Sequence, residues 1–281
     1  MSENELLFSL FFVSCRSKNK VEQPMIKDFD LLQRANNDYT TIDLEHAEEL
    51  AYRELIDSIR YIPLGDECGV MGNIANIITY KGRFYIQEEQ FDRVFIYDDT
   101  GRCLKKIDNK GRGPGEYLRI ESIDINTEKE ELMLVDGMSD KLFFYDLDGN
   151  FKSIHSIRYF QTENTLCLRD SVFLHISAPS QNFGNEGLYG YALVLSKGNE
   201  NFLKGYRYLP LQVGYKGGGQ IFKGYERSCY HPIYSDTIYQ ILSDTTYGPI
   251  FYFKIKNSSW EKYHNSDRFV DIDGSEEGVF T

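Results

Sequence analysis

The sequence predicts an all-β fold, a β-propeller assembled from repeated four-stranded sheets, and two observations support this prediction. The first is an internal repeat: Asp98 recurs as Asp146 and Gly101 recurs as Gly149, each 48 residues further along the chain. The second is the composition, since 15% of the residues are aromatic and the chain contains 21 tyrosines and 23 glycines. Aromatic residues favour strands and glycines favour turns, so this composition suits a sheet protein with many hairpins.

Each copy of the repeat contains four short strands joined by hairpins. β-Branched and aromatic residues fill the apolar runs, and Gly or Asp stands at the turns between them. The runs of the first copy are 74–79, 84–86, 93–98 and 104–107, and those of the second are 123–126, 132–134, 141–146 and 151–154. Four antiparallel strands recurring every 40 to 50 residues or so are typical of propeller blades, which cover their two faces by packing against one another. The alternative is a meander or sandwich that contains two similar hairpins.

Weaker signals follow the two clear copies. The runs that suggest a third and a fourth blade are 172–176, 191–195, 202–203, 233–242 and 249–255. With the first blade starting near residue 60, a period of about 48 residues accommodates four blades and part of a fifth in 281 residues. We therefore expect an incomplete propeller whose end blades have apolar faces left uncovered.

Several motifs stand in a characteristic order around the repeat. They are Tyr85-Ile86, the segment 95–101 (Phe-Ile-Tyr-Asp-Asp-Thr-Gly), the segment 111–117 (Gly-Arg-Gly-Pro-Gly-Glu-Tyr), and the segments 62–64 and 235–239. This order resembles that of the six-bladed β-propeller lipoproteins of the Bacteroidetes, relatives of the NHL-type propellers, over roughly residues 40–255. The resemblance implies a six-bladed ring in a cell-envelope protein. Because this sequence holds fewer blades, a truncated product is favoured over an open arc.

The first 15 residues resemble a lipoprotein signal peptide. Residues 6–13 form an apolar run that is too short to span a bilayer, and Ser14-Cys15 follows it as in a lipobox whose cysteine is acylated. Residues 1–5 are acidic where such a peptide is basic, so either the true start lies upstream or the run is a buried strand or helix with a chance cysteine. We divide the chain into a signal-peptide-like segment (1–15), a tether and N-terminal extension (16–59) and the propeller (60–281).

Residues 42–59 carry apolar side chains, among them Leu44 and Leu55, at helical spacing. Asp43 is suited to cap the N-terminus of such a helix. This pattern predicts a helix beside the first blade. The alternative is a strand through Ile42 followed by a loop.

Charge and the usage of cysteine and histidine exclude several functions. The net charge of −12 leaves no basic stripe to neutralise phosphates, so no nucleic-acid partner is expected. The five cysteines, at 15, 68, 103, 167 and 229, have no Cys-x-x-Cys spacing, and the five histidines are scattered, so neither a metal site nor a cofactor is expected. Cys103 and Cys167 lie in apolar runs and are expected in the core, and the sequence favours no particular disulfide.

Residues 111–117 form the least ordinary stretch of the chain. In a propeller they join the outermost strand of one blade to the innermost strand of the next. Gly111, Gly113, Gly115 and Pro114 allow a tight crossover at this place. We expect Gly113→Val to destabilise the fold by roughly 1–3 kcal/mol, through a forbidden φ or a backbone clash.

The polar residues of this crossover have two interpretations. In the structural one, Arg112 and Glu116 pair with each other or with the neighbouring backbone. In the functional one, Arg112, Glu116 and Tyr117 present a ligand-binding surface at the mouth of the channel.

No catalytic motif accompanies the fold, and Asp124 is the acidic residue among the first strands of the two clear copies, opposite Asn76. We therefore expect a non-enzymatic binding or scaffold module for a protein or glycan partner in the cell envelope. It is expected to be anchored to the membrane through a lipid on Cys15 and to face the periplasm, because no acidic cluster follows that cysteine. The alternative is a propeller enzyme, a hydrolase or lyase with its site at the central channel. A sensor or scaffold in a polysaccharide-uptake locus is a third interpretation.

Overall fold

The structure is a computed structural model that describes most of the chain between residues 30 and 255. The described ranges are 30–31, 33–34, 38–46, 56–157, 162–169, 172–176, 191–197, 201–208, 219–223, 228–232, 235–242 and 246–255. Within these ranges the regular secondary structure is entirely β-strand. No described segment is a helix with the length and hydropathy needed to cross a membrane.

The first two blades are antiparallel four-stranded sheets built from the two clear copies of the repeat. Blade 1 consists of β4 (Ile74–Tyr80), β5 (Arg83–Glu88), β6 (Arg93–Asp98) and β7 (Cys103–Ile107). Blade 2 consists of β8 (Ser122–Asn126), β9 (Glu131–Asp136), β10 (Lys141–Asp146) and β11 (Phe151–Ser156). In both blades the strands pair in chain order, as the repeat predicts.

The third and fourth blades repeat this order and gain short strands from the N-terminal part of the chain. Blade 3 consists of β12 (Asn164–Arg169), β13 (Val172–Ile176), β14 (Tyr191–Lys197) and β15 (Asn201–Tyr208), with β1 (Asp30–Leu31) parallel to β15. Blade 4 consists of β16 (Gln220–Lys223), β17 (Ser228–His231), β18 (Thr237–Ile241) and β19 (Thr246–Lys254). β2 (Gln33–Arg34) and β3 (Thr40–Asp43) both run parallel to β19.

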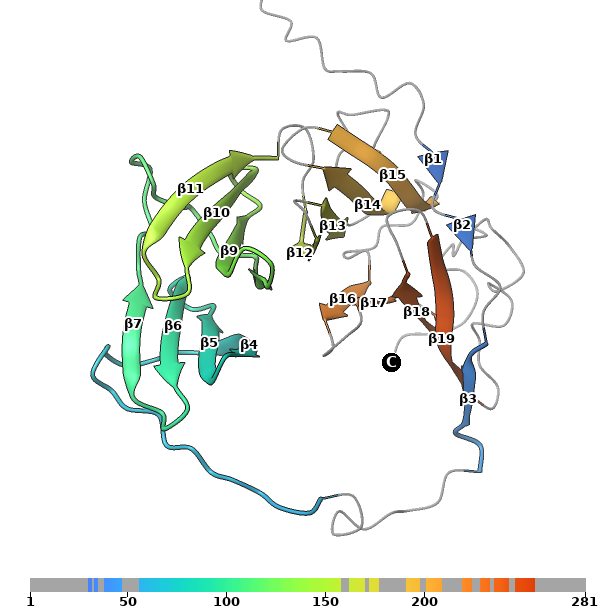
Figure 1. Cartoon of the computed structure of the whole chain (residues 1–281), viewed down its shortest axis with the longest axis horizontal. Coiled ribbons are helices and arrows are strands. Elements are labelled where there is room, and N and C mark those ends of the chain that lie inside the picture. Colours follow the sequence, from blue (N-terminus) through green and yellow to red (C-terminus); the bar gives the residue numbers. More distant parts are fainter. Residues whose placement is uncertain are drawn as a thin grey trace, which may run out of the picture.

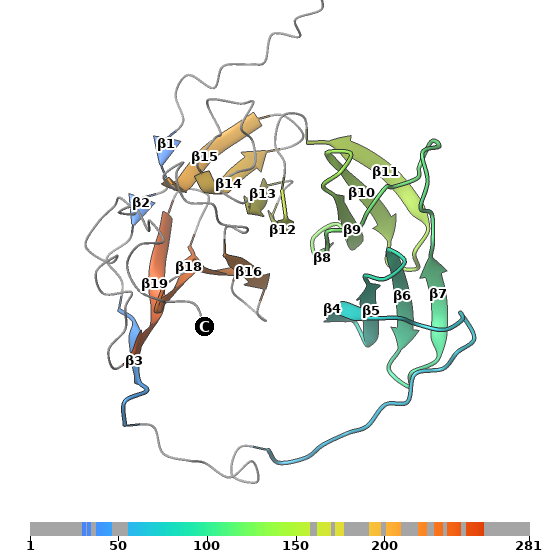
Figure 2. The ribbon, with the colours of Figure 1, turned by 180° about the vertical axis from the view of Figure 1, so that it is seen from behind.

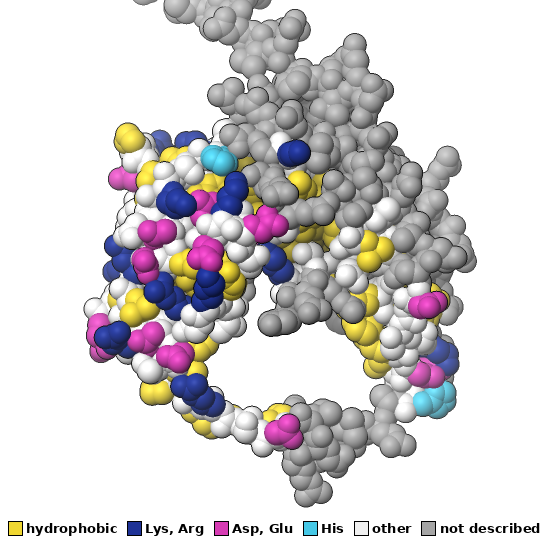
Figure 3. Space-filling model, viewed as in Figure 1, with side chains coloured by type: hydrophobic (Ala, Val, Ile, Leu, Met, Phe, Trp, Pro, Cys, Tyr) yellow, Lys and Arg dark blue, Asp and Glu magenta, His cyan; other side chains and the backbone are white. Residues whose placement is uncertain are grey.

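The four blades lie around a common centre, with β4, β8, β12 and β16 innermost (Figure 1). The prediction of an all-β propeller arrangement with four blades is confirmed. Seen from either side, an opening separates blade 1 from blade 4, and residues 56–73 run along part of its outer margin (Figures 1 and 2). The space-filling view shows the same opening, and it shows acidic and basic side chains interspersed over blades 1 and 2 (Figure 3).

The helix predicted for 42–59 is wrong in the part that the structure describes. Ile42 and Asp43 belong to β3, whose residues pair with Phe253 and Lys254 of β19. The backbone N–H of Leu44 continues the pairing by donating to the carbonyl of Lys254 at 3.0 Å. The edge of β19 offers these backbone partners, so the alternative prediction, a strand through Ile42, is the one observed. Residues 47–55 lie outside the described ranges.

The two copies of the repeat also share the detailed geometry of one hairpin turn, the turn that follows the Tyr-Asp strand. Gly101 (φ 89°) and Gly149 (φ 80°) both adopt the left-handed conformation, and one carboxylate oxygen of Asp98 and of Asp146 accepts the backbone N–H groups two and four residues ahead. Hydrogen bonds, first among them that from the Thr100 hydroxyl, lower the pKa of Asp98 to about 2. The aspartates thus serve as turn caps, which explains why both copies end the strand in Tyr-Asp.

Apolar side chains fill the spaces between neighbouring blades. Blades 1 and 2 bury residues such as Tyr85, Ile96 and Phe143 in one cluster, and blades 2 and 3 bury Met133 and Phe173 in another. A third cluster joins blades 3 and 4. Each fully buried side chain of this kind contributes roughly 1.5–3 kcal/mol of hydrophobic stabilisation, so the blades are held mainly by their mutual packing.

The interface between blades 2 and 3 also holds a buried histidine. His175 is 0% exposed, with Nδ1 at 2.9 Å from the hydroxyl of Thr165 and Nε2 at 2.7 Å from that of Ser196. Burial lowers the pKa of His175 to about 3, so the ring is neutral at physiological pH. In the unfolded chain His175 takes up a proton near pH 6.5, whereas in the folded protein it stays neutral at that pH.

This difference predicts a loss of stability in mild acid. The folded-state pKa lies below the unfolded value, so the contribution of neutral His175 is complete above about pH 6.5 and falls away as the pH drops toward 3. Urea unfolding at pH 7 and pH 4.5 should show that His175→Gln removes about 1–3 kcal/mol of the wild-type decrease between the two conditions. The exposed His46→Gln is the matched control and should keep the wild-type decrease. An unchanged decrease in His175→Gln would contradict the assignment.

Candidate functional site

The crossover between β7 and β8 is closed by its own backbone. The N–H of Gly111 donates to the carbonyl of Tyr117 at 2.9 Å, and the N–H of Tyr117 donates to the carbonyl of Asn109 at 3.1 Å. A tighter turn lies inside this loop, where the N–H of Glu116 donates to the carbonyl of Gly113 at 3.1 Å. Paired backbone groups fix the shape of the crossover without a regular strand or helix.

The side chain of Glu116 holds the loop in this shape. Its carboxylate accepts the N–H of Gly113 at 2.6 Å, and it also fills the space beside Gly111, where an added Cβ would lie 2.0 Å from Oε2. Of the pairings predicted for Glu116, the one with neighbouring backbone is observed. The side chains of Glu116 and Arg112 are both exposed at this rim of the propeller.

Tyr117 has a different place from the one that the functional interpretation requires. It is 0% exposed, and its hydroxyl donates to the carbonyl of Asp92 at 2.8 Å and accepts the N–H of Asn109 at 3.1 Å. Its ring meets Phe143 of blade 2 edge-on, with centroids 6.0 Å apart, and burial raises the pKa of its phenol. Tyr117 therefore anchors the crossover in the core between blades and cannot contribute to an exposed aromatic surface.

Asp92, at the turn between β5 and β6, completes the anchor and was not singled out from the sequence. It adopts φ 57°, its carboxylate accepts the N–H of Ile120 at 3.1 Å, and it forms an ion pair with Lys110. The signal that could have found it is the repeat, because Asp140 stands 48 residues later with φ 53°. The turn and the crossover are thus joined by three groups of one residue: its backbone carbonyl and both carboxylate oxygens.

Near the centre of the arc, Asp124 of β8 is paired with a lysine. The Oδ2 atom of buried Asp124 accepts the N–H of Cys167 at 2.7 Å and lies 3.3 Å from Nζ of Lys223. Nζ also donates to the carbonyls of Ile125 and Cys167, at 3.0 and 2.8 Å. Burial raises the pKa of Asp124 even though Lys223 opposes the shift. The ion pair therefore joins the innermost strands of blades 2 and 4, and hydrogen bonds from both of its members to the backbone of Cys167 add that of blade 3. Lys223 was missed because blade 4 departs from the 48-residue pattern.

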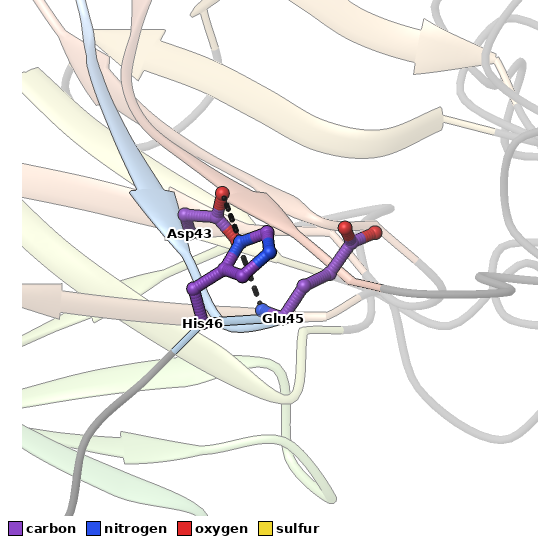
Figure 4. A group of neighbouring side chains, drawn as sticks. All are labelled: Asp43, Glu45 and His46. Atoms are coloured by element: carbon purple, nitrogen blue, oxygen red, sulfur yellow. Dashed lines mark hydrogen bonds and ion pairs between the residues drawn. The ribbon is translucent and has the colours of Figure 1, made fainter.

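One group of potential metal ligands occurs among the residues that the structure describes: Asp43, Glu45 and His46, at the end of β3 (Figure 4). Each offers a ligand atom, and these atoms lie within 4.8 Å of one another. All three are exposed, and Nζ of Lys254 stands 3.2 Å from a carboxylate oxygen of both Asp43 and Glu45. A metal ion would have to displace this ammonium group, so the cluster is best described as an ion-pair contact between β3 and β19.

A disulfide links Cys68 to Cys103, with Cα atoms 6.0 Å apart. The expectation that Cys103 is a simple core residue is therefore wrong, because the segment before β4 brings Cys68 against β7. Cys167 is a buried free cysteine, as predicted, and burial raises the pKa of its thiol to about 12. Cys229 is also buried and outside the disulfide, whereas Cys15 lies outside the described ranges.

The blades and their crossover define a protein of the β-propeller class. The chain belongs to the family described as "Domain of unknown function (DUF4934)", which matches residues 39–279. No curated protein matches the sequence.

The chain is similar to several solved structures of bacterial proteins. A crystal structure of a "Putative exported protein" of Bacteroides fragilis is 21% identical with a TM-score of 0.66, and the match covers 76% of this chain and 60% of that one. A DUF4221 family member of Bacteroides vulgatus is 11% identical (TM-score 0.40; 63% and 56% covered). A virginiamycin B lyase of Staphylococcus aureus is 10% identical (TM-score 0.43; 66% and 57% covered). The first similarity shows a shared fold, and this chain spans less than two thirds of the length of each of these proteins.

The sequence pointed to Gly113 as the glycine of the crossover that is most sensitive to substitution, but in the structure that glycine is Gly115. Gly115 has φ 82° with nothing within 4 Å of an added Cβ, whereas an added Cβ at Gly113 meets the flexible end of Glu116 at 3.1 Å. We expect Gly115→Ala to lower the free energy of unfolding by about 1–2 kcal/mol through left-handed backbone strain. The matched change Gly113→Ala should cost less than about 1 kcal/mol, since Glu116 can move aside. Urea denaturation of both variants checks the order, and equal losses would contradict it.

Proposed function

We propose that this chain is an exported, non-enzymatic propeller that serves the cell envelope as a binding or scaffold module for a protein or glycan partner. The observation that carries the proposal is the Cys68–Cys103 disulfide within a propeller. Structural disulfides persist in oxidising compartments such as the periplasm and the cell surface, and are rare in the cytosol. The related structure from Bacteroides fragilis, described as exported, supports the same compartment.

The proposal includes the finer features that the sequence resemblance implies. These are a six-bladed, NHL-like ring, a lipid anchor on Cys15 and a periplasmic orientation. The greater length of the Bacteroides fragilis relative supports the larger ring, because this chain matches only 60% of it. The apolar run 6–13 followed by Cys15 supports the anchor.

The proposed binding surface lies on the rim that carries the crossover. Arg112 and Glu116 are exposed there, and the hydrogen bond from Tyr117 to Asp92 holds the β5–β6 turn beside them. This turn presents Phe91, which is 46% exposed and lies 4.5 Å from the guanidinium of Arg93. An exposed ring next to charged hydrogen-bonding groups suits a polar partner with apolar patches, as proteins and sugars both are.

The proposal that the protein is non-enzymatic is supported by the centre of the arc. Among the described inner strands, buried Asp124 is engaged by Lys223 and by backbone N–H groups. A general acid or base needs an ionisable group that can reach a substrate, and this carboxylate is 3% exposed. The pair therefore favours a structural link at this place over a reacting centre.

The binding surface can be tested with a double variant. Binding to a glycan array and to envelope extract should fall by about tenfold or more in Arg112→Ala/Glu116→Gln, because both charged contacts are lost. The melting temperature should change little, because Arg112 is exposed and the amide oxygen of a glutamine at position 116 can still accept the N–H of Gly113. Arg102→Ala, on the exposed hairpin that follows β6, is the control and should bind like the wild type. Wild-type protein that captures nothing above background in either assay would contradict the proposed function.

The anchor has a separate test. Expressed from its natural start in a bacterial host, the protein should incorporate labelled fatty acid, its maturation should be sensitive to globomycin, and Cys15→Ala should lose both properties. Cys229→Ser, at a buried cysteine outside the disulfide, should keep them. Persistent labelling of Cys15→Ala would refute the anchor, and removal of the protein from intact cells by protease would refute the periplasmic orientation.

A further inference from the structure

The chain before β4 lies against blade 1 as a strap, defined here as residues 60–73 (Figure 2). Its backbone carries no regular strand or helix. It is held by an Arg60 guanidinium donating to the carbonyl of Asp99 at 2.9 Å and by the N–H of Gly65 donating to the carbonyl of Gly101 at 2.8 Å. The hydroxyl of Tyr97 donates to the carbonyl of Gly65 at 3.2 Å. The Cys68–Cys103 disulfide joins the strap covalently to β7.

The strap covers a face of blade 1 that would otherwise be apolar and exposed. Ile86, Phe95 and Tyr97 on this face are at most 2% exposed, and Cys68 and Met71 of the strap pack against them. The outer side of the strap is open to solvent, with Tyr61 87% and Val70 84% exposed. Among the residues that the structure describes, the cover over these side chains is therefore one chain thick.

The repeat shows what this face is built to contact. The three covered side chains correspond, 48 residues later, to Leu134, Phe143 and Tyr145 of blade 2. In blade 2 those side chains pack against the sheet of blade 1. Among the described residues, the strap therefore covers this face of blade 1 in the way that blade 1 covers the equivalent face of blade 2.

We propose that the Cys68–Cys103 disulfide is a redox latch whose reduction frees the strap and uncovers the apolar face of blade 1. Both sulfur-bearing residues are partly exposed, so an external dithiol can reach the bond. One thiolate of the dithiol attacks a sulfur of the bond to form a mixed disulfide, and its second thiolate displaces the protein sulfur. The reductant leaves as a disulfide, and the protein has gained two electrons and two protons as two thiols.

Two features make the latch decisive for the position of the strap. The disulfide fixes Cys68 of the strap to the first residue of β7, and breaking it increases the conformational freedom of the strap around Cys68. The remaining contacts of the strap with the β6–β7 hairpin are a few hydrogen bonds at or near the surface and the packing of Met71 against the covered face. Cys167 and Cys229 are buried thiols outside the disulfide and are shielded from exchange, so among the described residues reduction acts on the Cys68–Cys103 bond.

Limited proteolysis of the full chain tests the latch. Trypsin cleavage after Arg60, in the strap, is compared with cleavage after Lys129, in the β8–β9 turn of blade 2, before and after treatment with dithiothreitol. We expect cleavage after Arg60 to rise by about tenfold on reduction, together with greater binding of a dye that reports apolar surface. Cleavage after Lys129 and the far-ultraviolet circular dichroism should stay unchanged.

Variants separate the latch from general destabilisation. Cys68→Ser/Cys103→Ser should show the reduced pattern with or without dithiothreitol, and Cys229→Ser should keep the full redox response. Equal cleavage after Arg60 in the oxidised and reduced protein would overturn the proposal. A parallel rise after Lys129 would also overturn it, because reduction would then unfold the blades themselves.

Discussion

The main constraint on this chain is that a four-stranded blade has two apolar faces, and exposing either face to water is unfavourable. Burial of one large apolar side chain contributes roughly 1.5–3 kcal/mol, so the few side chains of a single face rival the net stability of a domain, about 5–15 kcal/mol. Blades 2 and 3 satisfy the constraint by packing against a neighbour on each side. Blade 1 has a neighbour on one side and the strap on the other. The stability of the array therefore depends on the interfaces between neighbouring blades, as in other repeat proteins.

Polar groups distinguish one interface from the next. Between blades 2 and 3, the carboxylate of Asp124 accepts the N–H of Cys167, and the hydroxyl of Ser122 accepts the N–H of Thr165 at 3.4 Å. Buried polar groups are costly when they lose their partners, so blade 2 fits here only against a sheet that supplies matching donors and acceptors. An apolar interface adapts more readily to a different neighbour. This contrast explains how the strap, which has no regular secondary structure, can cover the face of blade 1.

The parts of the fold that follow the 48-residue period could be predicted from the sequence. Asp98 and Asp146 mark the same turn, and periodic apolar runs place the strands between them, so blades 1 and 2 were predicted correctly. The backbone role of Glu116 was also among the predicted pairings. Burial of Tyr117 was not predicted, because a tyrosine after Gly-Pro-Gly suits both a rim and a core, and only the carbonyl of Asp92 in the neighbouring turn decides between them.

The remaining features depend on contacts that no local pattern encodes. Asp43 meets Lys254 across 211 residues of sequence, and the edge of β19 makes a strand of a segment whose spacing favours a helix. Lys223 reaches Asp124 from a blade that does not keep the period, and Cys68 meets Cys103 through a segment without secondary structure. Each of these contacts joins elements already positioned by blade packing, so each depends on the fold and does not cause it. The disulfide differs in one respect, because it holds the strap against the face of blade 1 that lies away from blade 2.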